Sequence, residues 1–166
     1  IYGDTFKVPE GYFPKVGARV MSLQEPTKKM SKSDENENAY IALLDPPDVV
    51  RRKIKRAVTD SENTIVYRED KPGIQNLMTI YSSLTGKTME EIETEFQGKG
   101  YGAFKEAVAE AVIETLRPIQ DRYDTIMKDK AYISKVIKES AEKAQRIADR
   151  TLAKVYRKVG FVARER

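Results

Sequence analysis

Residues 29–33 read Lys29-Met30-Ser31-Lys32-Ser33 and lie in a polar run between two short apolar segments. The pentapeptide places two ammonium groups three residues apart and interleaves them with hydroxyls. Two lysines on a loop can close round a polyphosphate, because each offers a compact charge and three donors. Loop amides and serine hydroxyls can add neutral hydrogen bonds. The pattern indicates phosphate handling, although a solvated turn is the commoner outcome for an arbitrary basic pentapeptide.

The segments on either side of this loop have the length and composition of strands. Residues 1–27 are rich in proline and glycine and contain one short apolar run, residues 18–23. Residues 39–44 form a second apolar run, whose Tyr40 and Ile41 favour extended backbone. We therefore expect a connection that feeds one strand, then the polar loop, then a second strand.

From Asp45 onward the apolar residues recur at helical spacing. Asp45 precedes two prolines, so we expect its carboxylate to accept hydrogen bonds from the free amides of a first helix. Thr88 and Glu91 have the spacing of a capping box. The remaining helical patterns begin at Pro72, at Tyr101 and near Ser134. The chain is therefore predicted to be mainly α, a helical bundle preceded by a small strand-bearing portion.

Composition excludes several kinds of chemistry. The chain has neither cysteine nor histidine, which removes disulfides, thiolate and imidazole catalysis and the commonest zinc ligands, so we expect no metal held by the protein. Its opening residues do not resemble a secretory signal and no apolar run could span a bilayer, which predicts a cytoplasmic protein without a membrane partner. Because Ile1 opens the sequence in mid-pattern, we interpret the chain as a fragment.

Residues 29–33 are identical to the signature loop of class I aminoacyl-tRNA synthetases, and other sequence segments resemble the bacterial-type tryptophanyl branch of that family. The segments that carry this resemblance are residues 17–23, 26–34, 57–61, 71–74, 98–102 and 114–120. The signature alone would indicate only a class I synthetase. The other segments favour tryptophan over the other amino acids as the substrate. The resemblance extends from about Tyr2 to Tyr156.

The resemblance implies a reaction and a set of residues. Such enzymes activate tryptophan with ATP and Mg²⁺ to an adenylate and pyrophosphate, then pass the aminoacyl group to the tRNA for tryptophan. By position, Lys29 and Lys32 would be the catalytic residues that stabilise charge on the leaving pyrophosphate. The residues implied to bind ATP are Val20, Lys29, Met30, Ser31, Lys32 and Ser33. Val20 would hold the adenine through its backbone, and Met30 would be an apolar latch for the closing loop.

The resemblance also implies a domain division. Residues 1–44 would be the C-terminal remnant of a Rossmann-type nucleotide-binding catalytic domain, and residues 45–166 a helical domain that binds the tRNA anticodon region. The family's histidine-containing signature and most of its tryptophan pocket and dimer interface would lie in an earlier half. We therefore expect the full-length protein to be a homodimeric ligase and this chain alone to be inactive. The alternative is a non-catalytic helical tRNA-binding module.

Two basic regions are candidates for other contacts. The last helical pattern carries five cations at spacings of 3, 4, 4 and 3, which stacks them in one stripe suited to a nucleic-acid backbone. This basic stripe is Lys143, Arg146, Arg150, Lys154 and Arg157. An earlier cluster, Arg51-Arg52-Lys53-Lys55-Arg56, is interpreted as a solvated helix face opposite Val50 and Ile54.

Leu84-Thr85-Gly86-Lys87-Thr88 ends like a phosphate-binding P-loop. The first glycine of that motif would fall at Tyr81, and the segment follows a helical pattern instead of a strand. Gly86 is therefore predicted to end one helix, and Thr88 to cap the next.

Overall fold

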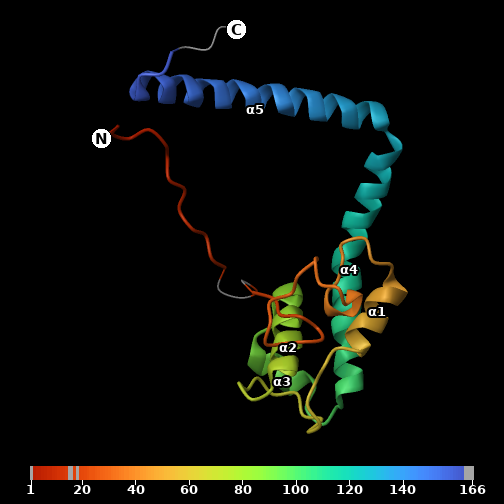
Figure 1. Cartoon of the computed structure of the whole chain (residues 1–166). Coiled ribbons are helices and arrows are strands. Elements are labelled where there is room, and N and C mark those ends of the chain that lie inside the picture. Colours follow the sequence, from red (N-terminus) through yellow and green to blue (C-terminus); the bar gives the residue numbers. More distant parts are fainter. Residues whose placement is uncertain (1, 15–16, 18, 163–166) are drawn as a thin grey trace. The chain divides into compact units, whose positions relative to one another are not determined.

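The computed structural model describes residues 2–14, 17 and 19–162 of the chain, and its described part is mainly helical, as predicted. Two compact units are formed, one by residues 13–122 and the other by residues 1–12 with 123–166. The elements are η1 (Glu37–Ala39), α1 (Pro47–Lys55), α2 (Pro72–Thr85), α3 (Met89–Glu95), α4 (Tyr101–Lys128) and α5 (Lys130–Val159), and Figure 1 labels the five α-helices.

The prediction of two strands is wrong for the described residues. Residues 39–44 begin in the short helix η1, which Asn36 caps by accepting from the amide of Asn38, and then pass into a turn. Met21 and Lys29 form an isolated antiparallel bridge. An isolated pairing this short lacks the neighbouring strands that stabilise a sheet. Ala18, at the start of the predicted strand, lies outside the described residues.

The helix ends follow local sequence signals in most places. Thr88 and Glu91 form the predicted capping box, and Gly86 ends α2 with φ +76°. Asp45, however, does not cap α1, whose N-terminal position is Pro46 without a side-chain hydrogen bond. Its carboxylate instead accepts from the amide of Ala42 at 2.9 Å and from Lys53 Nζ at 2.7 Å. Asp45 is therefore a charge partner rather than a cap.

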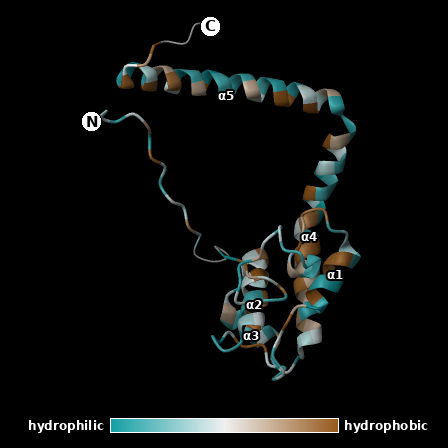
Figure 2. Cartoon of the chain, viewed as in Figure 1, coloured by the Kyte–Doolittle hydropathy of each residue, from teal (hydrophilic) through white to brown (hydrophobic). Residues whose placement is uncertain are grey.

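The first unit has a continuous hydrophobic core. Three aromatic side chains, Tyr81, Phe96 and Phe104, meet edge to face with ring centroids 4.9–5.9 Å apart. Aliphatic residues surround them, among them Val50, Ile54, Ile74, Leu77, Ile92 and Val108. In Figure 2 the apolar residues of α2 and α4 are visible within this unit. Helices α1 to α3 and the first turns of α4 are thereby fixed against one another.

A buried lysine, Lys71, is held by several polar partners in this unit. The Lys71 side chain is 1% exposed and makes an ion pair with Glu62 at 2.7 Å. It also donates to Thr64 Oγ1 at 2.7 Å and lies 3.3 Å from Asp60 Oδ1, which accepts from the Tyr101 hydroxyl at 2.6 Å. A buried ammonium group must have such partners, because removal from water is costly.

The second unit is dominated by α5. Asp129 caps this 30-residue helix by accepting from the amide of Tyr132, and Gly160 ends it with φ +80°. None of its residues is buried, and Ile137 and Ile147 are more than half exposed. Lys158 Nζ donates to the carbonyls of Tyr2 and Asp4 at 3.0 and 2.7 Å, which ties the N-terminal segment to α5. No helix among the described residues is long and apolar enough to cross a membrane.

Candidate functional site

The predicted phosphate loop rises from a short paired stem. The amide of Met30 donates to the carbonyl of Val20 at 3.0 Å, and the amide of Ser22 donates to the carbonyl of Lys28 at 2.9 Å. Val20 and Met30, two of the predicted ATP-binding residues, are therefore joined through their backbones.

Asn76 on α2 fixes the stem to the helical core. Its side-chain oxygen accepts from the amide of Met21 at 2.9 Å, and its side-chain nitrogen donates to the Met21 carbonyl at 2.8 Å. Asn76 is buried, so this two-way pairing also satisfies its own polar groups. The neighbouring Leu23 is buried and accepts from the amide of Val58 through its carbonyl. The loop thus has a rigid base.

The sequence contained a signal for this role that the prediction did not use. Asn76 lies among Ile74, Leu77 and Met78, which form the apolar face of α2. A buried amide in such a face needs partners from elsewhere in the chain. Those partners are 55 residues away, so the sequence pattern alone does not identify them.

The two lysines predicted to be catalytic differ from their neighbour Lys28. Lys29 and Lys32 are exposed, and within the described chain neither has an acidic partner. Lys28 makes an ion pair with Glu25 at 2.5 Å, and the hydrogen bond to that carboxylate raises the pKa of Lys28. The charges at Lys29 and Lys32 are therefore available to a ligand, whereas the charge at Lys28 is partly satisfied.

The two serines of the loop contribute mainly to its local shape. Ser31 Oγ accepts from the amide of Ser33 at 3.2 Å, and the Ser31 carbonyl accepts from the amide of Asp34 at 3.2 Å. These contacts form a tight turn over residues 31–34, which contains Lys32. Both serines are exposed, so each hydroxyl proton remains available to donate to a ligand oxygen.

Unlike the exposed side chains of Lys29 and Lys32, the Met30 side chain is partly buried and packs against the hydrophobic core. An apolar cavity of about 330 Å³ adjoins it, lined also by Val20, Ile41 and Leu116. The flexible methionine side chain can repack within such a space as the loop moves. The latch role of Met30 stays a prediction.

The basic stripe of α5 is displayed to solvent along the whole of its length. All five of its residues, named above, are exposed. The described chain provides none of them with an ion pair, whereas the adjacent Lys158 holds the carbonyls of Tyr2 and Asp4. The stripe belongs to the second unit and the phosphate loop to the first. Arg164 and Arg166, further cations of the C-terminus, lie outside the described residues.

The segment that ends like a P-loop has a structural role. Lys87 makes an ion pair with Glu95 at 2.7 Å, and Thr88 caps α3. The exposed Gly86 has the left-handed backbone that ends α2. The predicted helix stop at Gly86 and the predicted cap at Thr88 are therefore confirmed.

Comparison with known proteins identifies the family of this chain. Residues 2–117 match the family model for class I tRNA synthetases of the tryptophan and tyrosine type, so the chain belongs to that family. Within it, similar curated proteins include several tryptophan–tRNA ligases. Those of Clostridium acetobutylicum and Wolinella succinogenes are 51% and 52% identical over 99% and 97% of this chain. The predicted tryptophanyl relationship is thus confirmed.

The chain spans about half the length of the curated relatives it matches, 49% for both proteins named above. The crystal structure of tryptophanyl-tRNA synthetase from Mycoplasma pneumoniae matches 90% of this chain with a TM-score of 0.79 and 34% identity. The match covers 45% of that solved chain. The helical fold described here is therefore one that a known tryptophanyl-tRNA synthetase contains.

Proposed function

We propose that the full-length protein is a tryptophan–tRNA ligase, to which this chain contributes the phosphate-binding loop and a helical tRNA-binding part. The substrates would be tryptophan, ATP with Mg²⁺ and the tRNA for tryptophan. The Mg²⁺ would arrive with the ATP phosphates rather than in a site of the protein's own. The similarity to tryptophan–tRNA ligases over nearly the whole chain supports this proposal.

One observation carries the assignment of the loop: Lys29 and Lys32 have no ion-pair partner among the described residues and are held on a stem that is fixed to the core. When a tryptophan carboxylate oxygen attacks the α-phosphorus of ATP, the bond to the bridging oxygen breaks and pyrophosphate leaves with its electrons. Lys29 and Lys32 would donate to that departing group, where negative charge increases. The Asn76 anchor would reduce the motion that otherwise weakens such donors.

The other loop residues would assist in this binding. Ser31 and Ser33 would donate secondary hydrogen bonds to phosphate oxygens, and Met30 would fasten the closed loop to the apolar cavity beneath it. Val20 would contact adenine through its backbone. We assign these ATP contacts to residues 1–44, the remnant of the catalytic domain. Residues 45–166 would form the tRNA-binding domain of a homodimer.

A comparison of two activities tests the ligase proposal against the non-catalytic module. In the full-length protein, Lys32→Ala should depress the rate of adenylate formation far more than the affinity for tRNA. A loss of tRNA affinity with unchanged adenylate formation would favour the module. The 166-residue chain alone should show no tryptophan-dependent exchange of pyrophosphate into ATP, and robust exchange would contradict the assignment of the tryptophan pocket to another part of the protein.

The basic stripe of α5 has its own test. Charge reversal at Arg146 and Arg150 should weaken tRNA binding and reduce its dependence on salt, because fewer counterions would be released. The matched variant reverses Lys135 and Lys138, which are exposed on the same helix but outside the stripe. Equal effects of the two pairs would show that α5 contributes only general charge.

A further inference from the structure

The cations of α1 do not form the uniform solvated face that the sequence suggested. Lys53 is only 4% exposed and makes an ion pair with Asp45 at 2.7 Å, so its prediction as a solvated residue is wrong. Arg51 pairs with two carboxylates of α4, those of Glu106 and Glu110. These two cations therefore hold α1 in place within the first unit.

The C-terminal end of α1 is also satisfied without its own cations. Lys105 Nζ, on α4, donates to the carbonyl of Ala57 at 2.8 Å and to that of Lys55 at 3.4 Å. The side-chain nitrogen of Gln24 donates to the carbonyl of Arg56 at 3.0 Å. The usual structural reason for basic residues in a last helical turn, compensation of free carbonyls, is thus already met by other residues.

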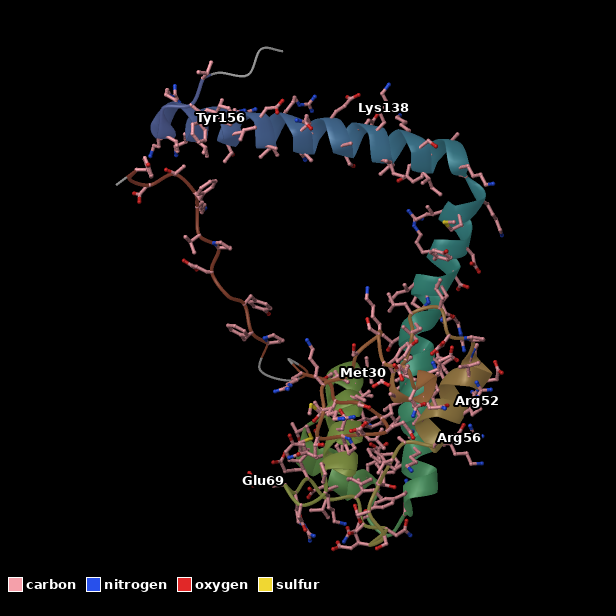
Figure 3. The ribbon with its side chains drawn as sticks, viewed as in Figure 1. Met30, Arg52, Arg56, Glu69, Lys138 and Tyr156 are labelled. Carbon is pink, nitrogen blue, oxygen red and sulfur yellow. The ribbon has the colours of Figure 1, made fainter. Side chains whose placement is uncertain are left out.

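Three cations remain: Arg52, Lys55 and Arg56. All three are exposed, and in the described chain none has an ion pair or a side-chain hydrogen bond that would occupy its charge. Figure 3 shows Arg52 and Arg56 directed outward from α1. Their spacing of three and four residues makes them neighbours on the helix surface, where like charges repel by about 0.2–0.5 kcal/mol per pair. A polyanion would relieve this repulsion.

We propose that Arg52, Lys55 and Arg56 form a surface on α1 that binds the phosphate backbone of the tRNA, separately from the basic stripe of α5. This inference rests on the proposed function. Two of the three residues are arginines, whose planar fork can bind a phosphate through two hydrogen bonds. The three residues include no aromatic side chain for base stacking, so the contact is to the backbone and independent of base sequence.

The rigidity of α1 strengthens this assignment. Val50 and Ile54 are each 1% exposed in the core, and the Arg51 and Lys53 ion pairs fix the flanks of the helix. The three cations are therefore presented on a fixed helix in the same unit as the phosphate loop. Such a surface can orient a tRNA relative to that loop with little loss of backbone entropy on binding.

Binding of the tRNA for tryptophan to the full-length protein, measured by anisotropy between about 50 and 200 mM KCl, tests the surface. The triple variant Arg52→Gln, Lys55→Gln, Arg56→Gln should lose roughly 10-fold in affinity, and the slope of log affinity against log salt should fall by about 2. The charge-matched control is Lys7→Gln, Lys135→Gln, Lys138→Gln, at exposed positions away from α1. This control should retain most of the slope.

Equal losses in the two triple variants would overturn the proposal, because only net charge would then matter. An unchanged slope in the α1 variant would overturn it as well. A polyglutamate chain provides the other source of negative charge: loss of its binding with unchanged tRNA binding would identify an acidic protein as the partner instead. Pyrophosphate exchange needs no tRNA, so the ligase proposal can fail in that assay independently of this one.

Discussion

Lys71 and the pair Lys29 and Lys32 show two opposite uses of the same side chain within one unit. Lys71 is 1% exposed and is surrounded by Asp60, Glu62 and other oxygen donors and acceptors. Lys29 and Lys32 are exposed and lack an acidic partner in the described chain. The comparison shows that the role of a lysine depends on its partners more than on its presence in a motif. A lysine paired with carboxylates stabilises the fold, whereas a lysine without such partners can bind a ligand.

The largest stability effect is expected at Lys71. Lys71→Met should lower the free energy of unfolding by roughly 3 kcal/mol, because it leaves the carboxylate of Asp60 without its cation in a partly buried position. Lys29→Met should change the same quantity by less than about 0.5 kcal/mol. Urea unfolding of the two variants measures the contrast. Similar losses in both would mean that the loop lysines are also structural.

Removal of the loop anchor should have a smaller effect. Asn76→Ala deletes both hydrogen bonds to Met21 and leaves a backbone donor and acceptor without partners, at a cost of about 2 kcal/mol. The rate of tryptophan-dependent pyrophosphate exchange in the full-length protein should also fall, because the loop would lose its fixed base. Gln75→Ala, one position earlier on α2, is the matched control. An exchange rate unchanged by Asn76→Ala would show that the loop is positioned by other contacts.

Thr88→Ala should cost about 1 kcal/mol, since it removes one half of the capping box of α3. The exchange rate should stay unchanged, because Gly86, Lys87 and Thr88 have no predicted role with phosphate. Thermal unfolding and pyrophosphate exchange on one preparation check both statements. Loss of ATP affinity in the folded variant would revive the P-loop interpretation of this segment.

The smallest effect on stability is expected from acid, through the Asp60 carboxyl. Burial alone would raise the pKa of the Asp60 carboxyl, but hydrogen bonds from Tyr101, the backbone of Glu62 and Lys71 outweigh burial and lower that pKa below its ordinary value of 3.8. Its stabilisation is therefore fully present above pH 3.8 and is lost as the pH falls through the lowered pKa. Asp60→Asn should reduce stability at pH 7 and lose that difference in more acidic solution, as measured by urea unfolding. A difference that persists in acid would exclude this carboxylate as its source.

Local signals in the sequence predicted much of the helical part. The capping box at Thr88 and the stop at Gly86 depend on neighbouring residues, and both are present. Asp45 was wrongly predicted to cap α1, because its carboxylate has a stronger partner in the Lys53 ammonium group, which lies within that helix. The strand predicted for residues 39–44 requires a neighbouring strand that the described chain does not provide.

The signature indicated candidate site residues, which stay a prediction, but it did not indicate their physical setting. Asn76 and Lys71 act through contacts with residues 55 and 30 positions away, which no periodic pattern specifies. The division of the α1 cations into paired and free groups likewise depends on Glu106 and Glu110 of another helix. Long-range pairing therefore determines which charges are free, and the sequence reports only where the charges are.

The most direct test of this account is the rate of tryptophan-dependent pyrophosphate exchange in the full-length protein, at a temperature where every variant is folded. Lys32→Ala should lower that rate by about 10²–10³-fold, the loss expected for one donor to a developing negative charge. Lys28→Ala, which removes a lysine already paired with Glu25, and Lys71→Met should remain close to the unaltered protein. A rate for Lys32→Ala no lower than that for Lys28→Ala would contradict the claim that the free lysines serve the phosphates.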